Sequence, residues 1–174
     1  MMDSTKINEV PGNLFDYDKE YALVHCVDAG FTFNAGLAKF FQVKYSTRDE
    51  LRQAFPHYHW TGHGECLVTN DGNIFNLVTK NGYYDKPTLE NLKEALVDLK
   101  EKCKAIGVSK IAMPRLGCGY DGLYWSDVRN AIDEVFLGEI FDVRIVYLHE
   151  AIHGTIIEPE LPQKKDKLLS KKFY

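Results

Sequence analysis

A glycine-rich junction in the second half of the chain reads Met113-Pro-Arg-Leu-Gly-Cys-Gly-Tyr-Asp-Gly-Leu-Tyr-Trp125. The short apolar run 110–113 before it is typical of a buried strand, and the pattern after it predicts a helix over 126–138. Glycine accepts positive φ and lets a ligand approach the main chain. A strand, a glycine loop and a helix N-terminus form a natural anion cradle, because free N–H groups and the positive helix end face one point. We therefore expect a ligand at this loop, on the carboxyl edge of a sheet.

One carboxylate, that of Asp121, lies inside this predicted cradle. A negative charge in a phosphate site needs a reason, and catalysis is a candidate. The alternative is an ordinary tight turn with an exposed aspartate.

Strand and helix patterns alternate along most of the chain. Strands are predicted at 6–10, 21–27, 65–68, 74–78, 110–113 and 143–148, and helices at 48–55, 89–106 and 126–138, with another entered after the small-residue loop 28–38. The turn Asn70-Asp71-Gly72-Asn73 predicts an antiparallel hairpin. These patterns predict an α/β fold, with a mixed sheet covered by helices.

Several residues are expected to fix the ends and turns of these elements. Thr88 and Gly107 are the predicted caps of the longest helix. Thr47 with Glu50 three residues later has capping-box spacing. Asn34 tolerates the left-handed region, so we expect it to form the turn in the loop 28–38.

Composition narrows the class of protein. The 174 residues suggest one domain, and the net charge of −4 argues against a general nucleic-acid binder but not against recognition of one modified nucleotide. No apolar run is long enough for a membrane span, and the first residues lack the apolar core of a signal peptide. The four cysteines form no Cys-x-x-Cys pair. We expect a reducing, cytoplasmic setting and no membrane partner.

Histidines provide the residue types of a metal site. His57, His59 and His63 lie close together, but no acidic or sulfur partner has a recognisable spacing, so a surface loop is favoured over zinc. His25 lies within an apolar strand pattern and is expected to be a hydrogen-bonded interior residue.

Several segments together resemble the macrodomain family over residues 13–148. They are Gly12-Asn13-Leu14-Phe15, His25-Cys26-Val27, Ala35-Gly36-Leu37-Ala38, Leu77-Val78-Thr79-Lys80, Lys86-Pro87-Thr88 and 114–125. The resemblance is closest to the branch that holds the terminal ADP-ribose protein glycohydrolase and the antitoxin macrodomains that reverse DNA ADP-ribosylation. It implies a three-layer α/β macrodomain over residues 1–150, with a mixed, mostly parallel central sheet flanked by helices. Residues 151–174 would then form a lysine-rich tail or a docked terminal helix.

The resemblance also implies a site. ADP-ribose would lie across the carboxyl edge of the sheet, in contact with Asn13, Leu14, Asn34, Ala35, Gly36, Leu37, Ala38, Thr79, Pro114, Arg115, Gly117, Cys118, Gly119 and Tyr120. Lys80 matches the family's nucleophile on the distal ribose, and Asp121 matches its acid/base group. No cofactor or metal is implied, the substrate would be an ADP-ribosylated protein or nucleic acid, and a monomer would suffice.

Three positions depart from the family pattern. Asn13 replaces an aspartate that accepts a hydrogen bond from adenine, so weaker adenine binding is expected. Asn34 replaces the first glycine of the first phosphate loop. Asp28 lies near the same loop, where its carboxylate would repel a diphosphate.

The chemistry calls independently for a pair such as Lys80 and Asp121. Glycosidic cleavage needs a proton for the leaving group and a group that captures the electron-poor carbon. A neutral lysine amine can do the second and form a Schiff base with the opened sugar. We therefore predict an ADP-ribosyl hydrolase that removes mono-ADP-ribose from acidic side chains or a DNA base.

Two alternatives stay open at this point. One is a binding module that holds ADP-ribose without turnover. The other is a phosphatase or deacetylase acting on ADP-ribose 1″-phosphate or O-acetyl-ADP-ribose. Lys86 is the competing lysine, and we expect a structural or rim position for it.

Overall fold

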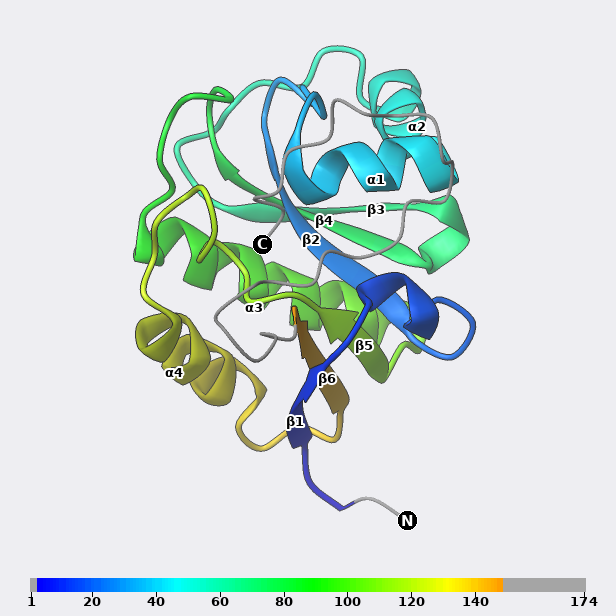
Figure 1. Ribbon diagram of the computed structural model, residues 1–174, viewed down its shortest axis with the longest axis vertical. Coiled ribbons are helices and arrows are strands. Elements are labelled where there is room, and N and C mark those ends of the chain that lie inside the picture. The colour runs from blue at the N-terminus through cyan, green and yellow to red at the C-terminus, as the bar shows by residue number, and fades with distance from the viewer. Residues whose placement is uncertain (1–2, 149–174) are drawn as a thin grey trace, which may run out of the picture.

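The computed structural model describes residues 3–148, which form a single central sheet with helices on both faces (Figure 1). The strands are β1 (Lys6–Pro11), β2 (Ala22–Asp28), β3 (Glu65–Thr69), β4 (Ile74–Lys80), β5 (Lys110–Met113) and β6 (Asp142–Tyr147). The α-helices are α1 (Gly36–Tyr45), α2 (Thr47–Ala54), α3 (Leu89–Ile106) and α4 (Trp125–Phe136), with short 3₁₀ turns at Leu14–Tyr17 and Asn70–Gly72. The expected lysine-rich tail, 151–174, lies outside the described residues.

The six strands are arranged in the order β1-β6-β5-β2-β4-β3. Every neighbouring pair is parallel except β3 and β4, which form the predicted antiparallel hairpin. β2 lies between β5 and β4, with nearly every residue buried, as expected of a strand covered on both faces. The carboxyl ends of β2, β4 and β5 therefore meet at one edge of the sheet.

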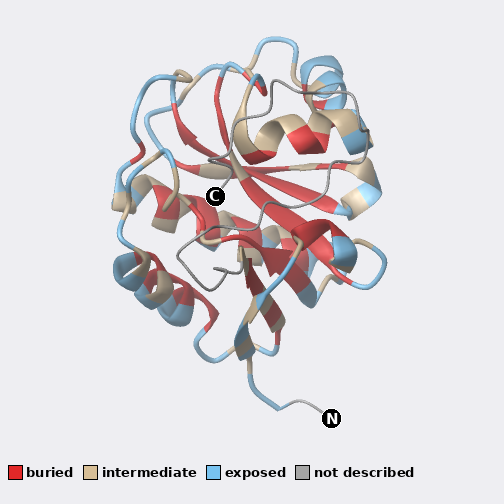
Figure 2. Cartoon of the chain, in the orientation of Figure 1, coloured by how far each residue is buried: buried red, intermediate tan, exposed pale blue. Residues whose placement is uncertain are grey.

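Two apolar layers enclose the sheet. On one face α3 and α4 pack through residues such as Leu96, Leu99 and Ile132. On the other face α1 and the first 3₁₀ turn contribute Phe40, Phe41 and Phe15, whose rings contact one another. Figure 2 shows the buried residues concentrated along the strands and on the inner faces of the helices. The mixed, mostly parallel three-layer arrangement confirms the predicted fold class.

The predicted caps of α3 are confirmed, whereas the predicted capping box at the start of α2 is wrong. Thr88 Oγ1 accepts a hydrogen bond from Asn91 N at 3.0 Å, and Gly107 ends α3 with φ of 77°. At α2, however, the N-cap is Ser46, which also ends α1 and has φ of 57°. Gln42 Oε1 on α1 accepts from Arg48 N at 2.8 Å, so the preceding helix supplies the acceptor that a capping side chain would provide.

Thr47 and Glu50 instead connect α2 to the β3–β4 turn. Thr47 Oγ1 lies 3.3 Å from Asn70 Oδ1, and Glu50 Oε2 accepts a hydrogen bond from Asn70 N. No helix within residues 3–148 is both long enough and apolar enough to cross a membrane.

Candidate active site

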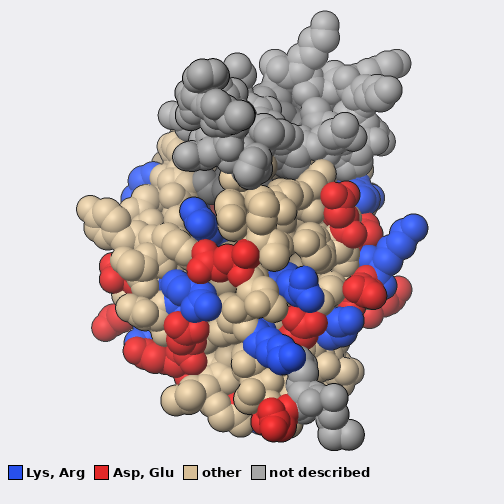
Figure 3. All heavy atoms as spheres, turned by 60° about the horizontal axis from the view of Figure 1, so that its bottom comes forward, with Lys and Arg blue, Asp and Glu red and all other residues tan. Residues whose placement is uncertain are grey.

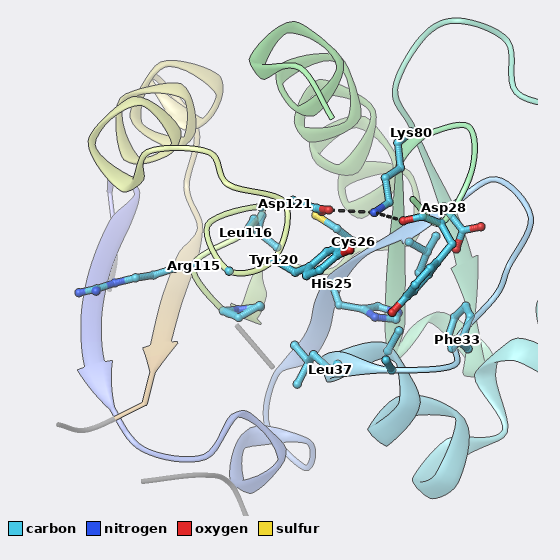
Figure 4. Close-up of a pocket in the computed structure, with 18 residues that line it drawn as sticks. His25, Cys26, Asp28, Phe33, Leu37, Lys80, Arg115, Leu116, Tyr120 and Asp121 are labelled. Carbon is cyan, nitrogen blue, oxygen red and sulfur yellow. Dashed lines mark hydrogen bonds and ion pairs between the residues drawn. The ribbon is translucent and has the colours of Figure 1, made fainter. Parts of the chain in front are cut away.

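A cavity of about 280 Å³ opens at the carboxyl edge of the sheet, between the loop after β2 and the loop after β5 (Figure 4). Its walls come from the ends of β2 and β4, the start of α1 and the glycine-rich loop. The lining residues are His25, Cys26, Val27, Asp28, Phe33, Ala35, Gly36, Leu37, Ala38, Lys80, Tyr83, Pro114, Arg115, Leu116, Gly117, Gly119, Tyr120 and Asp121.

Lys80 and Asp121 meet at the wall of this cavity. Lys80 Nζ lies 2.8 Å from Asp121 Oδ1, and the two side chains are 9% and 16% exposed. The same Nζ donates a hydrogen bond to the carbonyl oxygen of Tyr83 at 2.9 Å. Lys80 is the last residue of β4, and Asp121 lies in the loop before α4, so the topology brings together two residues that are 41 positions apart. The amine is held by two acceptors on separate loops.

The glycine-rich loop is shaped by its own backbone hydrogen bonds. Leu123 N donates to Gly117 O at 2.8 Å, and Gly122 N donates to Gly119 O at 3.2 Å. Gly117 and Gly122 have φ of 69° and 79°, which only glycine adopts without strain. These two turns project Asp121 towards the end of β4.

In the loop after β2, the left-handed backbone conformation occurs at two phenylalanines and not at the asparagine. Asn34 does not take the left-handed conformation; Phe31 and Phe33 do, with φ of 50° and 53°. Both rings are 3% exposed and pack into the core beneath α1. Burial of a phenylalanine contributes about 1.5–3 kcal/mol, which offsets the roughly 1–2 kcal/mol cost of a left-handed residue. Tertiary packing of the two phenylalanine rings therefore outweighs the local preference of asparagine for the left-handed conformation.

The carboxylate of Asp28 is turned onto its own loop. Asp28 Oδ2 accepts from Gly30 N at 3.2 Å and from Thr32 Oγ1 at 2.7 Å, and Oδ1 accepts from Thr32 N at 3.1 Å. The side chain is 5% exposed. These three hydrogen bonds stabilise the Asp28 carboxylate, whose negative charge was expected to repel a diphosphate. They also fix the shape of the loop.

The cavity brings together most of the predicted contact residues and leaves five out of its wall. The five are Asn13, Leu14, Asn34, Thr79 and Cys118. Asn13 Oδ1 accepts a hydrogen bond from Phe15 N at 3.0 Å and caps the first 3₁₀ turn, while Leu14 is fully buried in the core. Arg115 lines the cavity, but its guanidinium points away towards β1, where it lies 3.5 Å from Glu9 (Figure 4).

His25 lines the cavity, although the strand pattern around it predicts only an interior position. His25 Nε2 lies 2.6 Å from Asn76 Oδ1, and its ring stacks on Phe41 with centroids 3.8 Å apart. Asn76 Nδ2 donates to Leu67 O, so Asn76 Oδ1 must accept and His25 Nε2 carries the proton. Burial lowers the pKa of His25 to about 4. The predicted hydrogen-bonded interior histidine is confirmed, and it is neutral at physiological pH.

Sequence reasoning also missed Phe33 and Tyr83. Tyr83 follows β4 by three residues, and its carbonyl oxygen holds Lys80. Burial raises the pKa of the Tyr83 hydroxyl, with smaller contributions from neighbouring tyrosines and carboxylates. The sequence signal that could have identified Tyr83 as a site residue is its position in the loop that directly follows Lys80.

Neither cysteine near the cavity is an activated nucleophile. Burial raises the pKa of Cys26, and burial raises the pKa of Cys118 to about 11. Thiols with raised pKa values stay protonated near neutral pH and react slowly. Cys118 Sγ instead lies 3.3 Å from the carbonyl oxygen of Leu116 within the glycine-rich loop.

The three clustered histidines lie in a loop before β3. His63 Nδ1 contacts Glu94 Oε2 at 2.6 Å, which ties this loop to α3. Among residues 3–148, no group of three or more histidine, cysteine, aspartate or glutamate side chains is arranged to hold a metal ion.

The chain is similar to characterised proteins over most of its length, although no family model matches it. It is 36% identical over 143 residues to the ADP-ribose glycohydrolase OARD1 of Bos taurus, which covers 82% of this chain and 91% of that protein. The human protein of the same name is 35% identical with the same coverage. A DNA ADP-ribosyl glycohydrolase of Thermus aquaticus is 31% identical over 91 residues, which are 52% of this chain and 25% of that protein.

Solved structures give the same fold. The macrodomain of Thermus aquaticus DarG superimposes with a TM-score of 0.67 at 26% identity, over 83% of this chain and 99% of that one. Thermosipho africanus DarTG in complex with ADP-ribose superimposes with a TM-score of 0.65 at 18% identity, over 86% of this chain and 43% of that one.

Proposed function

The chain belongs to the macrodomain family, and from that premise we propose that it is an ADP-ribosyl hydrolase. It removes mono-ADP-ribose from acidic protein side chains or from a DNA base. The observation that carries this proposal is the contact between Lys80 Nζ and Asp121 Oδ1 at the wall of a cavity between two small-residue loops. An amine and a carboxylate in contact are the two groups that cleavage of a glycosidic or ester bond needs.

The cavity suits a nucleoside diphosphate with a second ribose. The start of α1, at Gly36, forms one wall and the loop at Gly117 and Gly119 forms the other. Small residues let backbone N–H groups reach phosphate oxygens, and the N-terminus of a helix favours negative charge. The diphosphate would be held between these loops, with the distal ribose at Lys80.

The reaction begins with proton transfer within the pair. The Lys80 ammonium gives a proton to Asp121 Oδ1, to which it is hydrogen-bonded, and the resulting amine attacks the anomeric carbon of the distal ribose. The bond from that carbon to the leaving group breaks, and Asp121 passes its proton to the leaving carboxylate or base. The ring then opens to a Schiff base on Lys80, which water hydrolyses to free ADP-ribose. The Tyr83 carbonyl keeps Nζ oriented throughout.

The experiment that tests this function is a release assay with two substrates. Glutamate-linked ADP-ribosylated protein and a base-linked ADP-ribosylated oligonucleotide are incubated with the wild-type protein, and free ADP-ribose is measured. Release from at least one linkage is expected. Tight binding of ADP-ribose with no release from any linkage would make the protein a binding module instead. Release only from ADP-ribose 1″-phosphate or O-acetyl-ADP-ribose would assign it to the phosphatase or deacetylase class.

We further propose that the protein works as a cytoplasmic monomer. All four cysteines are free, and two of them, Cys66 and Cys103, are fully buried. Unpaired thiols suit a reducing compartment. A single copy also supplies both Lys80 and Asp121 to the cavity wall, so the reactive pair needs no second subunit.

A further inference from the structure

Three tyrosine rings and one ammonium form a continuous row beside the reactive pair. The rings of Tyr84 and Tyr83 meet edge to face with centroids 5.0 Å apart, and Tyr83 stacks on Tyr120 at 6.4 Å with 20° between the planes. Lys86 Nζ lies 3.9 Å from the centre of the Tyr120 ring. We call these three rings, Tyr84, Tyr83 and Tyr120, the aromatic ladder.

The ladder is exposed on its outer side. Tyr84 is 81% exposed and Tyr120 is 54% exposed, although large aromatic residues are usually covered. Tyr83 is half-buried between them. Tyr84, the most exposed of the three rings, therefore offers solvent a ring face on which a planar partner can stack.

The ladder lies where the leaving group must depart. Lys80 Nζ is 5.6 Å from the centre of the Tyr83 ring and is bonded to the Tyr83 carbonyl oxygen. Asp121 directly follows Tyr120 in the chain. If Lys80 attacks the distal ribose, the group attached to that ribose is therefore next to the ladder.

The charges around the ladder argue against an acidic peptide. Lys80 is paired with Asp121, and Lys86 donates to the Tyr120 carbonyl oxygen at 2.6 Å. Both lysines of these loops are thus engaged within the protein. The nearby Asp85 carboxylate accepts from Gly82 N at 2.7 Å and adds negative charge. A partner that binds through its negative charges, whether carboxylates or phosphates, would gain no free cation here, whereas a nucleobase needs only a ring face.

We propose that the aromatic ladder is a stacking surface for the nucleobases that flank a modified nucleotide in a single strand. This inference rests on the proposed hydrolase function and deepens it, because it specifies the substrate that the site accepts. Stacking on aromatic side chains is tolerant of sequence, since every base has a π face. The ladder therefore selects a single strand without reading its sequence.

Binding through the ladder is weakly dependent on salt. Lysine–phosphate contacts release counterions and give steep salt dependence, but the lysines beside the ladder are already paired. On another face of the molecule, the one drawn in Figure 3, basic and acidic side chains of the described residues are interspersed. The affinity for the strand must then come from the rings and from the ADP-ribose itself.

The test compares one modified nucleotide alone with the same nucleotide at the centre of a single-stranded pentamer. For the wild-type protein, the KM for the pentamer should be lower by roughly 5- to 150-fold, the range that one stacked base gives. Tyr84→Ala should remove this advantage and leave kcat on the lone nucleotide unchanged. Tyr84→Phe should keep the advantage, because the ring remains. Leu137→Ala, which removes a side chain that is 82% exposed elsewhere, is the matched control.

Several outcomes would overturn the ladder proposal. Equal KM values for the pentamer and the lone nucleotide would do so, as would a pentamer advantage that survives Tyr84→Ala. A larger effect of Tyr84→Ala on a glutamate-linked peptide would assign the ladder to protein substrates. If the wild-type protein releases ADP-ribose from neither linkage, the proposed function fails. Equilibrium binding of the same two nucleotides to the intact protein then still tests the ladder.

Discussion

The Lys80 ammonium and the Asp121 carboxylate approach to 2.8 Å from opposite walls of one cavity. This contact joins the end of β4 to the loop that follows β5, and it places a primary amine beside a carboxylate. Six residues after Lys80, Lys86 makes a second connection to the same loop through the Tyr120 carbonyl oxygen. The proposed mechanism gives the two lysines separate tasks, one in chemistry and one in holding the loop, and variants can distinguish them.

Loss of either member of the reactive pair should abolish turnover without abolishing binding. We expect Lys80→Met and Asp121→Asn each to lower kcat by about 10²–10⁴-fold, the usual contribution of a positioned acid/base group. Binding of ADP-ribose should remain, because the loops that would hold the diphosphate are intact. Single-turnover release and calorimetry measure the two quantities. Lys93→Met is the control, since Lys93 pairs with Glu134 away from the cavity. Wild-type kcat in either variant would remove that residue from the mechanism.

A covalent adduct should form on Lys80. Borohydride added during turnover should reduce the Schiff base to a stable amine, because the imine carbon accepts hydride. Mass spectrometry of the digested protein should then place ADP-ribose on the peptide that contains Lys80. Lys86→Met should still give the adduct, and Lys80→Met should not. An adduct on another lysine, or none at all during active turnover, would contradict nucleophilic attack by Lys80.

Lys86→Met should slow the reaction while the fold stays intact. The substitution keeps the apolar stem and removes both the donor to Tyr120 O and the ammonium over the Tyr120 ring. Charge-assisted hydrogen bonds contribute about 1.5–3 kcal/mol, so the loop that carries Asp121 should lose its fixed position. We expect kcat to fall about 10-fold, with a smaller change in KM and in Tm because Lys86 is exposed. A fall in Tm that tracks the loss of kcat would instead indicate a purely structural role.

The sequence predicts the framework of this fold because its signals are local. The strands at 110–113 and 74–78, the stripe of α3 and its caps at Thr88 and Gly107 all depend on residues within one or two turns. The hairpin at Asn70–Asn73 is likewise a short-range signal. Such elements were found within a few residues of their bounds.

The sequence prediction fails where contacts with neighbouring elements override the local preference of a residue. Gln42 supplies the cap that Thr47 was expected to provide, and Phe31 and Phe33 take the left-handed conformation expected of Asn34. At the site, Lys80 and Asp121 could be named from the family resemblance, but the roles of Tyr83 and Lys86 depend on how two loops approach each other. All the predicted ligand contacts stay predictions, both those of residues that line the cavity and those of Asn13, Leu14, Asn34, Thr79 and Cys118.

His25 should make the stability of the protein depend on pH in a defined window. The unfolded chain binds a proton to this imidazole near pH 6.5, whereas burial lowers the pKa of His25 in the folded protein to about 4. Between these values the unfolded state binds more protons, so the free energy of unfolding should fall as the pH drops from about 6.5 to 4. At about 1.4 kcal/mol per pKa unit, the loss reaches about 3 kcal/mol.

The variant that isolates this effect is His25→Phe combined with Asn76→Leu. Phenylalanine can keep the stack on Phe41, and leucine avoids leaving Asn76 Oδ1 without the donor it has from His25.

Urea unfolding of both proteins at pH 4.5, 5.5, 7 and 8 gives the free energy of unfolding at each pH. The stability difference between wild type and variant should be constant above pH 7 and should shift in favour of the variant below pH 6.5, because only the wild type carries the neutral buried imidazole. His57, His59 and His63 are present in both proteins and cancel in the comparison. Parallel stability curves across the whole range would show that His25 is protonated as easily in the folded state as in the unfolded chain, and the lowered pKa of the buried imidazole would then be wrong.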